Sequence, residues 1–333
     1  MKSGFSVRKL LQNIAETYGK RYWNLSFSTK LWLNKLSFKN RLMRKLQPLL
    51  RRLYASYFEK ITSQKVLINN LDFDVLVIYD ACRLDYFSML YPRYFEGSLQ
   101  SALSAGSMTL EWLINTWYRD HYEVAYVSAT PLVKSGRPIL GFNAEEKFMY
   151  VDDVWNWGWS DSLTTVPPEK VNIAARLTTT KLGMKGLRLG EHYKLVIHYV
   201  QPHAPYLCLS RVSKKISESD IRETLEDIDA HKFGIVGEGK PTLDFLLLAL
   251  LKEITGSENK LIEYLRMLYQ SNLDLVMRAS CPLIRHFLKK GYDVVISADH
   301  GELLGEYGLF FHPRLHLPYL RIVPWFQVRS IRK

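Results

Sequence analysis

The segment FDVLVIYD, residues 73–80, is almost entirely apolar and ends in an aspartate. Three more segments share this texture, namely YEVAYVSA (122–129), KLVIHYV (194–200) and DVVISAD (293–299). Strands that are covered on both faces have such continuous apolar sequences, as in parallel sheets. Helix-like stretches separate them, and the clearest, residues 259–290, is followed by glycine as helix ends often are. The pattern predicts a three-layer α/β/α sandwich with a largely parallel central sheet.

The composition of the chain changes near residue 60. Residues 1–60 contain 14 Lys or Arg and two acidic residues, whereas the rest of the chain contains 31 of each kind. We predict a basic amphipathic helical segment at 1–60 and an α/β domain at 70–333, with a helical insertion at 207–260. Residues 320–328 are a weaker strand candidate, and Pro324 within them predicts an edge strand or a bend.

The sequence excludes several classes of protein. The N-terminus lacks the apolar centre of a secretory signal, and no segment has the 18 apolar residues of a transmembrane helix. Three widely spaced cysteines indicate neither a disulfide framework nor a Cys-x-x-Cys metal site. We therefore expect a cytoplasmic protein, peripheral at the inner membrane surface if residues 1–60 bind anionic lipid. Helix faces that pack on the domain are an equally open interpretation, and nucleic acid is a weaker candidate partner. Nothing in the pattern indicates an oligomeric state.

Polar residues stand where three of the predicted strands end. Asp80 ends the first strand, HYVQPHAPY (198–206) covers the end of the third, and Asp299, His300 and Glu302 follow the last. Ligands bind beyond the carboxyl ends of strands in open α/β sheets. Two aspartates and a histidine that meet there can hold a divalent cation. The sequence therefore predicts a metal site formed by Asp80, Asp299 and His300.

Three of these segments together resemble the alkaline phosphatase superfamily. VISADHGELLGEYGLFFHP (295–313) is similar to its signature, in which a strand leads into Asp-His-Gly-Glu with a histidine downstream. VLVIYDACRLDYF (75–87) resembles its opening strand, whose terminal aspartate binds metal. HAPY (203–206) resembles its substrate-side His-x-Pro-Tyr segment. The resemblance covers roughly residues 70–328 and implies that 70–333 is a catalytic domain.

The resemblance also implies roles for single residues. A nucleophile is expected at a helix N-terminus after the first strand, where LSAGSMTLEWLINTWY (103–118) stands. Alignment places Thr109 there, as nucleophile and metal ligand, with Ser107 as the alternative and a helix N-cap as the structural interpretation of Thr109. Further implied contacts are His203 beside the transferred group, His312 beside the leaving oxygen, and Arg83 and His316 toward substrate or a second metal.

The implied function is a metal-dependent hydrolase or phosphotransferase for a phosphate ester, with a phosphodiester or lipid head group favoured. The reaction would pass through a phospho-threonine intermediate and use one divalent ion, Zn²⁺, Mn²⁺ or Ca²⁺, with a second site as the alternative. The Cys/Ser-x-Pro-Ser-Arg run of sulfatases is absent. Alternatives are a sulfuric ester hydrolase, or an inactive relative that serves as a membrane-surface binding or scaffold module.

Overall fold

An eight-stranded sheet forms the centre of the structure, a computed structural model in which residues 26–209, 248–249, 251–253 and 255–332 are described. Neighbouring strands are parallel except where β10 pairs with β3 and with β7. The prediction of a largely parallel sheet is confirmed, and the four apolar segments form β2, β4, β6 and β7. In spatial order the strands are β1 (Thr62–Ser63), β3 (Phe95–Leu103), β10 (Ile322–Ile331), β7 (Val294–Ser297), β2 (Val75–Tyr79), β6 (Lys194–Tyr199), β4 (Tyr122–Ser128) and β5 (Phe148–Asp153).

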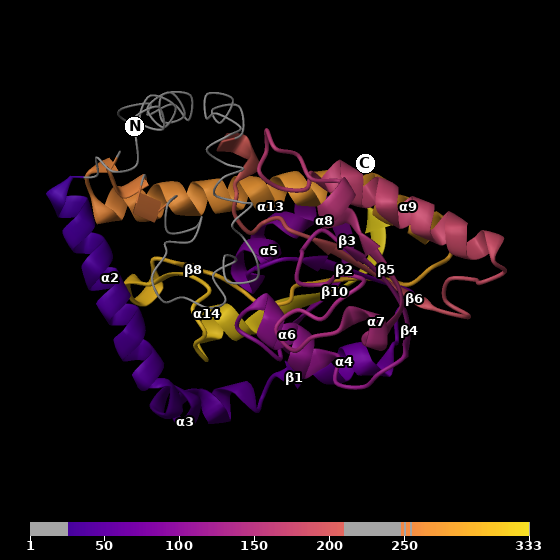
Figure 1. The fold of residues 1–333 in the computed structure, drawn as a ribbon, viewed down its shortest axis with the longest axis horizontal. Helices are drawn as coiled ribbons and strands as arrows, with labels where there is room; N and C mark the ends of the chain where they lie inside the picture. The colour runs from indigo at the N-terminus through magenta and orange to yellow at the C-terminus, as the bar shows by residue number, and fades with distance from the viewer. Residues whose placement is uncertain (1–25, 210–247, 250, 254, 333) are drawn as a thin grey trace.

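Helices cover both faces of the sheet, which confirms the three-layer arrangement (Figure 1). The longest helix of the described residues, α13 (Glu258–Lys289), is followed by Gly291 with a φ of +81°, a left-handed conformation that suits glycine. One face carries α5 (Leu84–Leu90), α9 (Pro168–Met184) and α13 (Glu258–Lys289), and the other carries α4 (Gln64–Asn70), α6 (Thr109–Thr116) and α7 (Ala144–Lys147).

The central strands are buried along their whole length because their residues are apolar on both faces. Every residue of β2 and of β7 is buried. The cluster that encloses them extends into both helical layers, to Val276 of α13 on one side and Trp112 of α6 on the other. Each square ångström of apolar surface buried in this way contributes about 25 cal/mol. The carboxyl ends of these strands are therefore held by the most tightly enclosed part of the domain.

β10 is an interior strand, which corrects the prediction of an edge strand or a bend at residues 320–328. It lies between β3 and β7. Pro324 opposes Ser101 of β3, whereas pairing with β7 begins only at Trp325. Because Pro324 lies just beyond the ladder with β7, that ladder loses no hydrogen bond to it. β3 has no apolar run that would reveal it in the sequence, since most of its residues alternate between exposed and partly buried.

The basic N-terminal segment contains two helices in its described part, α2 (Phe27–Lys45) and α3 (Gln47–Phe58). They meet at Leu46, and Pro48 lies in the first turn of α3, where a missing N–H costs nothing. Leu36 is buried in a second apolar cluster, which includes β8 (Leu303–Leu304), β9 (Phe310–Phe311) and part of α13. Both helices therefore pack along one side of the domain (Figure 1).

Part of the predicted organisation lies outside the described residues. This applies to the first part of the N-terminal segment, residues 1–25, and to most of the insertion predicted at 207–260. Among the described residues, no helix combines the length and the apolar character needed to cross a bilayer.

Candidate active site

Three buried side chains meet at the carboxyl ends of adjacent strands. Asp80 follows β2, Asp299 follows β7, and His198 lies in β6, opposite Ile78 of β2. β7, β2 and β6 are consecutive in the sheet, so the ends of these strands are neighbours although they are far apart in sequence. One ligating atom from each residue lies within 4.8 Å of the other two. We call Asp80, His198 and Asp299 the strand-end cluster.

His300 borders the strand-end cluster, where the sequence places it. Its Nε2 atom lies 3.6 Å from Oδ1 of Asp80 and 3.3 Å from Oδ2 of Asp299. Its Nδ1 atom lies 2.8 Å from the carbonyl oxygen of Gly301. A carbonyl can only accept, so Nδ1 carries the proton and the neutral ring presents the Nε2 lone pair to the site. Burial lowers the pKa of His300 well below its usual value, and the neighbouring His312 lowers it further.

Asp299 is oriented by the backbone around it. Its Oδ1 atom accepts hydrogen bonds from the N–H of Ala81 at 3.0 Å and of His300 at 2.9 Å. Its Oδ2 atom has no hydrogen-bond partner among the described residues. Ala81 has a φ of +59°, which is unfavourable for a residue with a Cβ. The Tyr269 hydroxyl donates to the Ala81 carbonyl at 2.7 Å, which holds the backbone in this conformation.

His198 is a site residue that no motif of the sequence indicates. Its Nδ1 atom is hydrogen-bonded to the Tyr126 hydroxyl at 2.8 Å. Its buried Nε2 atom has no hydrogen-bond partner among the described residues, and lies 3.9 Å from Asp80 and 4.0 Å from Asp299. Burial lowers the pKa of His198 to about 4, so the ring is neutral near pH 7. The available signal is that His198 is an ionisable side chain inside a buried apolar strand.

Thr109 is the first residue of α6 and points toward His300. Its Oγ1 atom lies 3.2 Å from Nε2 of His300, which accepts a hydrogen bond from the hydroxyl. The N-cap is Met108, so the N-cap interpretation of Thr109 is wrong. The Ser107 hydroxyl instead donates to Glu111 at 2.9 Å. The structure thus brings Thr109, rather than Ser107, to the histidine.

The loop before Thr109 is held against the strand-end cluster. The Ser104 hydroxyl donates to the backbone carbonyl of Asp299. A Cβ atom at Gly106 would lie 2.3 Å from the backbone nitrogen of Trp112, in the first turns of α6. Only glycine allows the loop to approach the helix so closely. These contacts fix the start of α6 relative to the end of β7.

A second cluster lies beside the first and consists of His203, Glu302 and His312. Potential ligand atoms of these residues also lie within 4.8 Å of one another. Nδ1 of His312 lies 2.9 Å from Oε1 of the buried Glu302. The His312 ring is 4.8 Å, centre to centre, from the rings of both His203 and His300. We call this group the loop cluster, and Glu302 is its member for which the sequence predicts no role.

The segment that carries His203 is fastened to α13. The side-chain amide of Asn272 donates to the carbonyl oxygens of Pro202 at 3.1 Å and His203 at 3.0 Å. Its carbonyl oxygen accepts from the N–H of Leu207 at 3.0 Å. One buried side chain therefore satisfies the backbone on both sides of the HAPY segment.

Arg83 is not brought into the site. Its guanidinium is buried and forms ion pairs with Asp85 at 2.6 Å and with Glu306 at 2.8 Å. It also stacks on the ring of Tyr319, with the guanidinium carbon 4.5 Å from the ring centre. Because both partners of the guanidinium belong to this chain, the ion pairs connect the loop before α5 with the segment that carries Glu306.

His316 lies among arginines near the start of α6. Its Nδ1 atom lies 2.8 Å from Arg321 of α14 (Pro318–Arg321), and its Nε2 atom lies 3.2 Å from Arg51 of α3. Burial, followed by these two cations, lowers the pKa of His316 to about 4. Glu111 lies 4.0 Å from His316 and 3.6 Å from Arg314. The group carries more positive than negative charge.

The donor atoms of the strand-end cluster fit a divalent ion. Nε2 of His198 and Oδ2 of Asp299 are buried without hydrogen-bond partners among the described residues, and both are aimed at the same small region. Leaving such groups without a partner costs about 1–3 kcal/mol each, which a bound cation would remove. Mixed carboxylate and imidazole ligands suit Zn²⁺ or Mn²⁺, whereas Ca²⁺ takes oxygen ligands.

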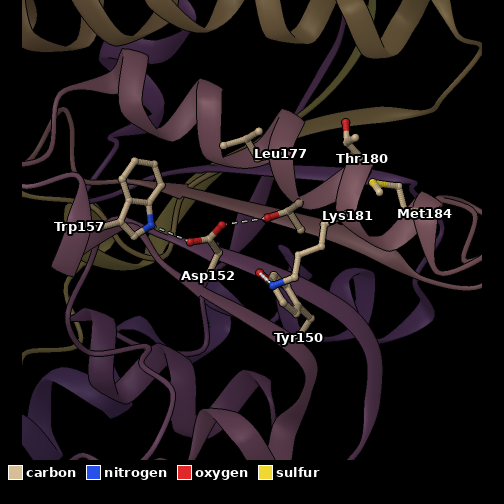
Figure 2. A pocket seen from close by; sticks show the side chains of 8 residues that line it. Tyr150, Asp152, Trp157, Leu177, Thr180, Lys181 and Met184 are labelled. Atoms are coloured by element: carbon tan, nitrogen blue, oxygen red, sulfur yellow. Dashed lines mark hydrogen bonds between the residues drawn. The ribbon is translucent and has the colours of Figure 1, made fainter.

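A surface hollow of about 410 Å³ lies elsewhere, between β5 and α9 (Figure 2). Asp152 lines the hollow and accepts hydrogen bonds from Trp157 at 2.9 Å and Thr178 at 3.0 Å. Lys181 and Tyr150 also line the hollow, and the Lys181 ammonium donates to the Tyr150 hydroxyl at 3.1 Å. None of its lining residues belongs to either cluster. The hollow therefore takes no part in the site.

Comparison with known proteins finds similarity in structure only. No protein-family model and no curated protein matches the chain. Among solved structures, the soluble domain of lipooligosaccharide phosphoethanolamine transferase A from Neisseria meningitidis matches at 15% identity and a TM-score of 0.41, over 77% of this chain and 76% of that one. The periplasmic domain of phosphoethanolamine transferase EptC from Campylobacter jejuni matches at 16% identity and 0.41, over 76% and 77%.

The phosphonate monoester hydrolase of Agrobacterium radiobacter matches at 11% identity and a TM-score of 0.36, over 77% of this chain and 67% of that one. These enzymes belong to the alkaline phosphatase superfamily, which the motifs of the sequence also resemble. At these identities and TM-scores the likeness assigns neither a function nor a substrate.

Proposed function

We propose that this chain is a metal-dependent hydrolase or transferase that acts on a phosphate ester, with Thr109 as its nucleophile. One observation carries the proposal. The Thr109 hydroxyl lies at the start of α6, 3.2 Å from the Nε2 lone pair of His300, which borders the strand-end cluster of metal-type donor atoms. A hydroxyl beside a site for a divalent ion, at a helix N-terminus, is what a phosphoryl transfer to a side chain requires.

Asp80, Asp299, His198 and His300 are the residues that would hold the ion. When bound, a Zn²⁺ or Mn²⁺ ion acts as a Lewis acid, which lowers the pKa of a nearby hydroxyl and offsets phosphate charge. The chain contributes the fixed geometry, because the backbone N–H groups of Ala81 and His300 hold the Asp299 carboxylate in one orientation. The first N–H groups of α6 add positive potential where a phosphate anion would lie.

In the proposed reaction, the Thr109 oxygen forms a bond to phosphorus while the bond from phosphorus to the leaving oxygen breaks. The hydroxyl proton leaves to solvent water, because the Nε2 lone pair of His300 would be taken up by the ion. His312 donates a proton to the leaving oxygen, and Glu302, 2.9 Å from its Nδ1, stabilises the charged ring. His203, whose ring centre lies 4.8 Å from that of His312, contacts the transferred group. Water, or an acceptor hydroxyl, then releases the phosphoryl group from Thr109.

The test is capture of the intermediate. The full chain is supplied with Mn²⁺ or Zn²⁺ and then with 4-nitrophenyl phosphate or its bis-ester, and stopped in acid within one turnover. Peptide mass spectrometry should find the added phosphoryl group on the peptide that contains Thr109. Thr109→Ala should lose both the adduct and more than a thousandfold in turnover, which corresponds to about 4 kcal/mol.

Matched variants separate this proposal from its rivals. Ser107→Ala removes a hydroxyl two residues away and should retain activity. If that variant is inactive and Thr109→Ala is active, the nucleophile is Ser107. Turnover of 4-nitrophenyl sulfate in preference to the phosphate would identify a sulfuric ester hydrolase. A chain that binds neither metal nor ester, while remaining folded, would be an inactive binding or scaffold module.

A further inference from the structure

The helices α2 and α3 are apolar on two faces. The inner face packs on the second apolar cluster of the domain through residues such as Leu36 and Leu50. The outer face carries large apolar side chains that nothing in the described part of the chain covers. In α2 these are Phe27, Leu31, Phe38 and Leu42, which are 81%, 44%, 63% and 45% exposed, and in α3 they are Leu49, Leu53 and Tyr57, which are 61%, 65% and 50% exposed.

The exposed apolar residues form stripes rather than a scatter. In α2 they are separated by four, seven and four positions, and in α3 by four and four. Such intervals keep side chains on one side of a helix of 3.6 residues per turn. Eight of the twenty exposed large apolar residues of the described chain lie at positions 27–57. An apolar surface of this kind on a folded protein usually marks a contact site.

Basic residues border this outer face. Residues 26–58 contain eight Lys or Arg and no acidic residue, and all eight basic side chains are exposed. On a helical projection, Lys30 and Arg41 lie on one flank of the α2 stripe, and Lys35 and Lys39 lie on the other. An apolar stripe between two rows of cations is the pattern of helices that lie in a membrane interface.

The chemistry of the face selects its partner. A nucleic acid would pair with the cations but would leave the aliphatic side chains in water, because stacking on bases needs aromatic rings. An ordinary protein partner would bury the leucines but would need a row of acids on each flank. An anionic bilayer meets both requirements, since acyl chains take up Leu and Phe while lipid phosphates pair with Lys and Arg.

We infer that the outer face of α2 and α3, defined by Phe27, Leu31, Phe38, Leu42, Leu49, Leu53 and Tyr57, docks on an anionic membrane surface. The inference is independent of the proposed chemistry. α3 also contacts the catalytic side of the domain, because Arg51 lies 3.2 Å from His316. A docked face would therefore hold the domain at the lipid surface through the side chains, such as Leu36, that α2 buries against it.

The experiment is co-sedimentation of the full chain with vesicles of phosphatidylcholine containing about one third phosphatidylglycerol, at low and high salt. The chain should bind these vesicles, bind pure phosphatidylcholine much more weakly, and dissociate as salt rises. Phe38→Gln combined with Leu42→Gln should lower the partition coefficient more than tenfold. Lys30→Glu combined with Lys35→Glu, which changes exposed side chains alone, should also lower it at least tenfold.

The matched controls lie on α9 and at its C-cap, Lys185, where apolar and basic side chains are also exposed. Leu177→Gln with Met184→Gln, and Lys181→Glu with Lys185→Glu, make the same changes there and should leave binding unchanged. Circular dichroism should show an intact fold in every variant. Unchanged binding of either α2 variant overturns the inference, as would happen if residues 1–25 alone held the chain. Loss of self-association rather than of vesicle binding, or tighter binding to nucleic acid than to these vesicles, overturns it as well.

Discussion

The strand-end cluster and the loop cluster offer similar donor atoms but are held in different ways. Asp80, His198 and Asp299 are all buried and lie in or just beyond three adjacent strands. In the loop cluster, His203 and His312 are partly exposed, and all three residues lie in loops. The first group cannot change its geometry without disturbing the sheet, whereas the second can adjust to a ligand.

The two clusters also differ in how their polar atoms are satisfied. In the strand-end cluster, the Nε2 atom of His198 and the Oδ2 atom of Asp299 have no hydrogen-bond partner among the described residues. In the loop cluster, the His312 ring is already paired with the Glu302 carboxylate. A rigid, unsatisfied set of donors suits a permanently bound ion, whereas a histidine paired with a carboxylate suits proton transfer. Variants in each cluster should therefore fail in different ways.

The largest effect is expected in the strand-end cluster. Asp299→Asn removes a charge from the ligand set while keeping the size of the side chain. Metal affinity and turnover should both fall more than a thousandfold, about 4 kcal/mol, because the site loses a carboxylate that nothing else supplies. Titration calorimetry with Zn²⁺ and Mn²⁺, together with ester turnover, measures this. Full metal affinity in the variant would show that the ion binds elsewhere.

A smaller effect is expected from His312→Gln in the loop cluster. Loss of a general acid typically costs about a hundredfold or more in turnover, near 2.7 kcal/mol. The loss should be larger for esters with poor leaving groups than for nitrophenyl esters, which need no protonation. Metal affinity should stay near that of the wild type. A hundredfold fall in metal affinity would instead assign His312 to a second metal site.

The stability of the metal-free chain should depend on pH through His198. Its pKa is about 4 in the fold, because burial disfavours the charged ring, and near 6.5 when unfolded. Between these pH values the unfolded chain binds more protons than the folded chain. The stabilising contribution of neutral His198 is therefore complete above pH 6.5 and is lost as the pH falls toward 4. The free energy of unfolding in urea should fall by about 2 kcal/mol from pH 7 to pH 5 on this account. His198→Gln should remove that part of the slope, and an unchanged slope would contradict the assignment.

The smallest effect is expected from Glu302→Gln. The amide still fills the buried space and can accept a hydrogen bond from His312, but it no longer stabilises the charged ring. Turnover should fall about tenfold, near 1.4 kcal/mol, and the basic limb of the pH–rate profile should move to lower pH. His312→Gln combined with Glu302→Gln should be little worse than His312→Gln alone. Additive losses would show that the two residues do not act as a unit.

The sequence predicts those parts of the molecule that rest on continuous apolar patterns. β2, β4, β6 and β7 are such patterns, and the layers of the fold follow from them. β3 and the interior position of β10 are missed, because the first alternates with polar residues and the second contains Pro324. Which side chains gather also depends on strand order, which a single sequence does not reveal.

Strand order explains why some site residues can be identified from the sequence and others cannot. Asp80, Asp299 and His300 stand at strand ends, so their convergence could be predicted, while their role as ligands stays a prediction. His198 lies one residue before the end of β6, and only the pairing of Ile78 with His198 shows that it faces Asp80. Arg83 has the sequence position of an anion contact, yet its guanidinium is already paired with Asp85 and Glu306.

The order of strands in the sheet has a consequence for synthesis of the chain on the ribosome. β7 can pair with β2 only after residue 294 has emerged, long after β2 and its other neighbour β6 have been made. Until then Asp80 and His198 lack Asp299 and His300, and a nascent chain offers no complete set of donors. A divalent ion would therefore be captured late, by a domain that is already assembled, and its binding energy would stabilise the finished fold rather than guide its formation.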